Sequence, residues 1–85
     1  MKEFSYVIQD KDGIHARPAG VLVKLANGFK SHVSISKAEK KGDLKRIFSV
    51  MALGAKQGDT VTVRVEGEDE EQASVALEEA LKKNL

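Results

Sequence analysis

The chain has 85 residues, no cysteine, 41% hydrophobic and 32% charged residues, and a formal net charge of +1. This composition is typical of one folded domain, residues 1–85, and it excludes disulfides, a cysteine-bound metal, and a bulk electrostatic attraction to nucleic acid or to a membrane surface. The chain contains neither the apolar run of a signal peptide nor the ~20 apolar residues of a membrane span, so we expect a cytoplasmic protein without direct membrane insertion.

A strand and a helix are predicted first. Residues 2–9 alternate apolar and polar side chains, which is the period of a half-buried strand, and the polar residues 10–13 end it. Between residues 16 and 27, apolar residues recur at i, i+3, i+4 and i+7, which indicates a helix. The pair Asn27-Gly28 predicts a left-handed residue at the end of this helix.

A hairpin and a short helix are predicted next. Residues 32–36 alternate in the manner of a strand, and the short polar segment 40–43 is expected to be an edge strand paired with them. The turn at 37–39 contains no Asn-Gly pair. Residues 44–53 form a compact apolar run with more than one apolar face, which predicts a short helix that ends at Gly54.

The last third of the chain predicts a strand and a helix. Three valines alternate with polar residues in 60–66, and we expect this strand at the centre of the sheet. Residues 69–83 carry a helical apolar stripe, with acidic residues in the first turn and lysines in the last, as the helix dipole favours. The order β-α-β-β-α-β-α with its tight hairpin predicts an α+β fold, in which a four-stranded antiparallel sheet has three helices packed on one face and water on the other.

The segment Gly13-Ile14-His15-Ala16-Arg17-Pro18 carries the clearest chemical signal. Proline is favoured in the first turn of a helix, so Pro18 places the helix start at about Ala16 and puts His15 at its N-cap. The free N–H groups and positive dipole end of a helix start favour an anion. They also disfavour a protonated imidazole by about 0.3–1 kcal/mol, which keeps the ring nucleophilic.

This arrangement predicts that His15 both attacks and holds a phosphoryl group. The Ala16 and Arg17 N–H groups are expected to bind the phosphoryl oxygens, together with the Arg17 guanidinium. Pro18 is expected to fix the geometry of the turn.

Three segments of the chain together resemble the HPr family, the histidine-containing phosphocarriers of the bacterial phosphoenolpyruvate-dependent sugar phosphotransferase system. They are Gly13-Ile14-His15-Ala16-Arg17-Pro18-Ala19, Val50-Met51-Ala52-Leu53-Gly54 with Gln57-Gly58-Asp59, and Val65-Glu66-Gly67-Glu68-Asp69-Glu70. The likeness extends in order over essentially the whole chain, and the open-faced β-sandwich of the family agrees with the predicted order of elements.

The resemblance implies a role for His15 in a relay. His15 would take a phosphoryl group on Nδ1 from phosphorylated enzyme I and pass it to the IIA domains of sugar transporters. We expect no cofactor, no self-sufficient catalysis and, from the family, a monomer. A related regulatory family lacks this histidine, so its presence places the chain with the phosphocarriers.

A docking surface for those partners is predicted beside His15. Gly20 lies on the same side of its helix as Arg17 and leaves the surface next to the histidine flat. The core face of the predicted 44–53 helix consists of Leu44, Val50 and Leu53. The remaining apolar side is interpreted as an exposed patch where, as the resemblance implies, partners bind; it consists of Ile47, Phe48 and Met51. The polar rim of the surface is expected to consist of Arg17, Lys24, Asn27 and Lys45.

Two positions depart from the family pattern. In many Gram-positive members a serine phosphorylated by a regulatory kinase stands where this chain has Arg46, which has no hydroxyl to modify. Ser49 lies one turn away in a different local sequence, so regulatory phosphorylation is not transferred to it. Glu39 stands where the family often has a turn glycine.

Two other functional classes fit less well. A self-sufficient enzyme needs an acid or base and a substrate cleft, and one candidate nucleophile in so short a chain does not provide them. An RNA-binding module needs exposed aromatic residues and a basic surface, whereas the chain has only three phenylalanines and one tyrosine, two of them on the expected core face of the first strand. His32 is expected to face solvent, and two histidines far apart without cysteine make a poor metal site.

Overall fold

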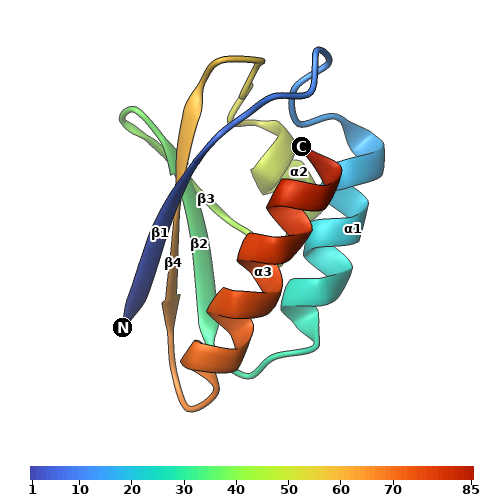
Figure 1. The fold of residues 1–85 in the computed structure, drawn as a ribbon. Coiled ribbons are helices and arrows are strands. Elements are labelled where there is room, and N and C mark those ends of the chain that lie inside the picture. Colours follow the sequence, from blue (N-terminus) through green and yellow to red (C-terminus); the bar gives the residue numbers. More distant parts are fainter.

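A computed structural model describes residues 1–85 and places one sheet against three helices (Figure 1). In chain order the elements are β1 (Lys2–Val7), α1 (Ala16–Asn27), β2 (His32–Lys37), β3 (Lys40–Asp43), α2 (Ile47–Met51), β4 (Thr60–Glu66) and α3 (Glu70–Asn84). The strands pair antiparallel in the order β1-β4-β2-β3, and the helices cover one face of the sheet. The predicted open-faced α+β sandwich is confirmed, with β4 in the interior of the sheet and β3 at its edge.

The apolar core lies between the sheet and the helices. The three valines of β4 are fully buried, and Leu22 of α1 and Leu77 of α3 are buried with them. Burial of each such side chain contributes about 1.5–3 kcal/mol, so this layer is the main source of stability. On the other face the strands present polar side chains, such as the Ser5 and Thr62 hydroxyls, whose oxygens lie 3.0 Å apart. None of the helices combines the length and apolar character needed to cross a bilayer.

The end of α1 differs from the prediction. Gly28 has φ −77° and ψ −9°, so it is right-handed, and the expected left-handed residue is wrong. The Gly28 N–H donates to the Leu25 carbonyl at 3.0 Å and the Phe29 N–H to the Ala26 carbonyl at 3.2 Å. These i→i+3 bonds tighten the last turn and satisfy the final carbonyls without a left-handed residue.

The second helix is shorter than the predicted 44–53, because α2 contains only five residues. Leu44 precedes it, and the Leu44 N–H donates to the Val33 carbonyl at 3.0 Å, so this residue extends the hairpin. After α2, the Leu53 and Gly54 N–H groups make i→i+3 bonds of 3.2 Å, which are turns and not helix.

The turn between β2 and β3 consists of Ala38 and Glu39, since Lys37 pairs with Lys40. Ala38 has φ +52° and is the only non-glycine residue with positive φ. A positive φ at the first central residue alone is the mark of a type II′ hairpin turn, which favours glycine there. The glycine-favouring position therefore lies one residue before Glu39.

Candidate functional site

His15 is the N-cap residue of α1, as Pro18 predicted. Its backbone is extended, with φ −109° and ψ −176°, and its carbonyl accepts the N–H of Ala19 at 3.0 Å. Pro18 is buried and has no N–H, while the N–H groups of Ala16 and Arg17 make no hydrogen bond within the protein. No side chain caps the helix. Two backbone donors are thus free at the helix start, where they can bind an anion.

The loop that carries His15 is held by backbone contacts on two sides. On one side, the N–H groups of Gln9 and Asp10 both donate to the backbone oxygen of Leu85 at 2.7 Å. On the other, the Ile14 N–H donates to the Ala55 carbonyl at 3.0 Å. The N-cap conformation of His15 is therefore set by contacts with distant parts of the chain.

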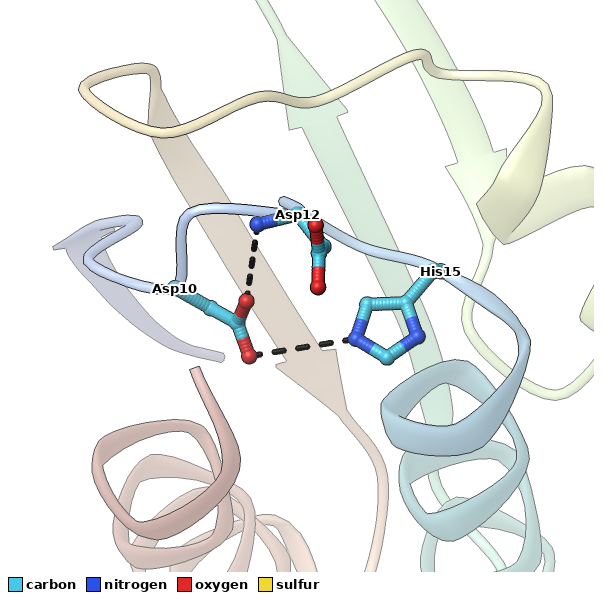
Figure 2. Close-up of side chains that lie close together, drawn as sticks. All are labelled: Asp10, Asp12 and His15. Carbon is cyan, nitrogen blue, oxygen red and sulfur yellow. Dashed lines mark hydrogen bonds and ion pairs between the residues drawn. The ribbon is translucent and has the colours of Figure 1, made fainter.

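The imidazole of His15 is accessible, with 41% of its side chain exposed. Its Nε2 lies 3.8 Å from Oδ2 of Asp10. Figure 2 shows the ring with Nε2 toward Asp10 and its other nitrogen, Nδ1, turned away from that carboxylate. The exposed Arg17 side chain takes part in none of the ion pairs. Its guanidinium is therefore not paired with a carboxylate of the protein.

Sequence reasoning missed the carboxylates beside this histidine, because it treated residues 10–13 only as the end of a strand. Asp10, Asp12 and His15 bring their ligand atoms within 4.8 Å of one another. Two carboxylates add negative charge next to the helix start, which by itself favours an anion. The histidine thus lies between an acidic loop and two free N–H donors.

A turn that faces this loop is held by Asp59. Its carboxylate accepts the Lys56 N–H at 2.8 Å and lies 3.0 Å from the Lys37 ammonium, and the hydrogen bond and the nearby charge lower the pKa of Asp59. The Asp59 carbonyl accepts the Ile8 N–H at 2.9 Å. This turn therefore buttresses the chain where it enters the histidine loop.

The predicted apolar patch is present in part on α2. Phe48 is 83% exposed and Met51 38% exposed, whereas Ile47 is partly buried against the core. The predicted core side is also confirmed, since Leu44, Val50 and Leu53 are all buried. A side chain built on Gly20 would meet nothing within 4 Å, so the surface beside it is open.

Two bonds place α2 along α1. The Asn27 amide donates to the Lys45 carbonyl at 3.0 Å near one end, and Ile14 bonds to Ala55 at the other. The C-terminal end of α2 therefore points toward the start of α1 and His15, which agrees with the view in Figure 1.

The residues of the expected rim differ in their roles. Lys24 is exposed and makes no ion pair. Asn27 donates from its amide to the carbonyls of Val23 and Lys45, and the Lys45 ammonium donates to the Phe29 carbonyl at 2.8 Å. Asn27 and Lys45 thus join α1 to the segment before α2. The sequence alone could not show this structural role, because these bonds connect residues that are far apart along the chain. His32 is exposed, as expected.

Comparison with known proteins agrees with this geometry. The phosphocarrier protein HPr of Mycoplasma capricolum is 44% identical over 81 residues, which are 95% of this chain and 91% of that protein. The crystal structure of an HPr from Thermoanaerobacter tengcongensis has a TM-score of 0.93 at 40% identity, covering 99% of this chain and 94% of that one. A structure described as an HPr dimer from the same organism has a TM-score of 0.78 at 41% identity, covering 98% and 95%.

The family match covers nearly the whole chain. Residues 2–83 match the family described as the PTS HPr component phosphorylation site. The chain therefore belongs to the HPr family of the phosphotransferase system, and it is a phosphocarrier rather than a self-sufficient enzyme.

Proposed function

We propose that His15 is the residue that carries the phosphoryl group, accepting it on Nδ1 from phosphorylated enzyme I and passing it to IIA domains of sugar transporters. The observation that carries this proposal is the accessible imidazole at the N-cap of α1, beside two N–H groups that have no partner. A nucleophile and an anion-binding site then share one position in the fold.

The transfer step needs little from the protein beyond placement and charge. The lone pair of Nδ1 forms a bond to phosphorus, while the bond from phosphorus to the donor breaks and the donor keeps its electron pair. The phosphoryl oxygens accept the Ala16 and Arg17 N–H groups, and the Arg17 guanidinium adds a charge-assisted bond. The same residues take part when the step runs in reverse and the phosphoryl group passes from Nδ1 to the next acceptor.

Enzyme I and IIA domains bind, in this proposal, on the surface formed by the start of α1 and by α2. Its apolar centre is Phe48 and Met51 with the exposed part of Ile47, and Gly20 and Lys24 of α1 are assigned to the same surface. The exposure of both Phe48 and Met51, three residues apart on one helix, supports this, because a contiguous exposed apolar patch is typical of a binding surface. Asn27 contributes by holding the two helices together.

Residues 1–85 act in this proposal as one cytoplasmic domain and as a monomer. The relative described as an HPr dimer makes the oligomeric state worth measuring directly. Light scattering during gel filtration is expected to give the mass of one chain at micromolar concentration, and a doubled mass would contradict the monomer.

The site is tested by incubating the protein with phosphoenolpyruvate and enzyme I. We expect an acid-labile, base-stable phosphoryl group in the wild type and in His32→Ala, and none in His15→Ala. A His15→Ala protein that still becomes phosphorylated would overturn the assignment. Loss of phosphorylation in His32→Ala alone would show that His32, and not His15, is the phosphorylated residue.

A further inference from the structure

We propose that Asp10 is a positioning residue that holds the neutral His15 ring with its proton on Nε2, which leaves the lone pair on Nδ1. This inference rests on the proposed function, because it explains why Nδ1 is the nitrogen that reacts. The contact behind it joins Oδ2 of Asp10 to Nε2 of His15 at 3.8 Å (Figure 2).

Asp10 is itself fixed in place at three points. Its Oδ1 accepts the Asp12 N–H at 2.8 Å, its carbonyl accepts the Gly13 N–H at 2.9 Å, and its own N–H donates to the backbone oxygen of Leu85 at 2.7 Å. With Oδ1 occupied, Oδ2 is the oxygen left to face the ring. The carboxylate is therefore a placed group and not a mobile surface side chain, and its position follows from the turn of the loop.

A fixed carboxylate beside one ring nitrogen selects the tautomer. In neutral imidazole only one nitrogen carries a proton, and a nearby acceptor favours the proton on the nitrogen that faces it. An ion-pair distance of 3.8 Å before reaction is compatible with a contact that tightens during it, as is common for catalytic hydrogen bonds.

The same contact assists the reaction step. When Nδ1 bonds to phosphorus and Nε2 keeps its proton, the ring gains positive charge, and the Asp10 carboxylate lies at the edge of the ring where this proton is held. The phosphoryl group is added at the other nitrogen, away from the carboxylate. Asp10 thereby favours positive charge on the ring without standing at the reacting atom.

Asp10→Asn tests the proposal with Asp12→Asn as its matched control. Asparagine at position 10 keeps an oxygen to accept the Asp12 N–H, but it removes the charge and replaces Oδ2, the acceptor that faces the ring, with an N–H donor. Asp12→Asn removes the charge of the other carboxylate, which lies within 4.8 Å of the ring but forms no ion pair with it, so this variant measures the effect of nearby charge alone. Nitrogen-15 chemical shifts of the His15 ring, measured where the ring is neutral, report the tautomer directly.

We expect the wild type and Asp12→Asn to hold the proton mainly on Nε2, and Asp10→Asn, whose amide N–H faces Nε2, to move the proton toward Nδ1. We also expect Asp10→Asn to lower kcat for transfer from phosphorylated enzyme I by on the order of 10-fold, with KM unchanged, because only the fraction of rings with the lone pair on Nδ1 can react. A wild-type ring protonated on Nδ1, or equal tautomer shifts in the two variants, would overturn the proposal. The wild-type spectrum tests the position of the proton even if a variant does not fold. The phosphorylation assay with enzyme I shows separately whether His15 carries the phosphoryl group, so the two proposals can fail independently.

Discussion

Gly13 approaches Ala55 so closely that a side chain has no room between them. A Cβ on Gly13 would lie 2.3 Å from the Ala55 carbonyl oxygen, and Gly13 has φ +66°. The next residue, Ile14, donates its N–H to that same oxygen at 3.0 Å. This contact fixes the position of the loop that places His15 at the start of α1.

We expect Gly13→Ala to destabilise the protein by about 2–5 kcal/mol, since overpacking costs ~1–3 and a left-handed alanine ~1–2 kcal/mol. Urea unfolding measures the change. Gly20→Ala is the control, because its side chain would meet nothing within 4 Å, and a helix-interior alanine is expected to stabilise by about 0.5–1 kcal/mol. Equal effects of the two substitutions would contradict the close packing at Gly13.

Ala38→Gly is expected to stabilise the hairpin by about 0.5–1 kcal/mol. Alanine at φ +52° is strained by ~1–2 kcal/mol, and glycine relieves this strain. Part of the stabilisation is lost again, because glycine has more conformational freedom in the unfolded chain. Glu39 has no positive φ, so Glu39→Gly is expected to bring no gain. Thermal unfolding of both variants checks this, and the reverse order would place the turn strain at Glu39.

Stability is expected to fall at acidic pH through Asp69. This carboxylate accepts the Ser31 hydroxyl and the N–H groups of Lys30 and Ser31, and these hydrogen bonds lower the pKa of Asp69. A lowered folded-state pKa stabilises the fold fully above the unfolded value of ~3.9, and this contribution is lost as pH falls through the folded-state value. Asp59 and Glu70 act in the same direction.

The free energy of unfolding, measured by urea titration from pH 7 down to pH 2, tests this sign. We expect the wild type to lose stability below about pH 4. Asp69→Asn is expected to be less stable at pH 7 and to show a flatter profile. A variant profile as steep as that of the wild type would exclude Asp69 as a main contributor.

Phe48→Ser is expected to weaken enzyme I binding by about 10-fold or more, as for loss of an aromatic anchor. Because Phe48 is 83% exposed, the free energy of unfolding is expected to stay within about 0.5 kcal/mol of the wild type. Val75 of α3 is 57% exposed and lies outside the proposed surface, so Val75→Ser is the control. Isothermal titration calorimetry measures the affinity for enzyme I. Equal affinities of the wild type, Phe48→Ser and Val75→Ser would show that Phe48 is not part of the interface.

Arg17→Ala is expected to slow phosphoryl transfer by about 10- to 100-fold through loss of a charge-assisted donor. Its exposed side chain makes no ion pair, so stability is expected to be unchanged. Arg46→Ala removes another exposed arginine, paired only with Asp43 at 3.8 Å, and is expected to transfer at the wild-type rate. Rapid-quench kinetics that show no difference between the two variants would argue against a role for Arg17 at the phosphoryl group.

The sequence by itself determined the features that depend on a few neighbouring residues. The alternating valines identified β4, the apolar periodicity identified α1 and α3, and Pro18 placed His15 at an N-cap. Each of these signals repeats or acts within one or two turns of backbone, so no distant contact is needed to interpret it.

Only the tertiary structure decided what depends on partners far along the chain. Leu44 is not helical because it bonds to Val33, and Asn27 is structural because its amide reaches Lys45. The orientation of His15 likewise depends on a loop that Leu85 and Ala55 hold from two sides, which brings the Asp10 carboxylate to the ring. Periodicity and capping act locally, whereas these contacts exist only once the sheet and helices have packed and brought distant backbone groups within hydrogen-bond distance.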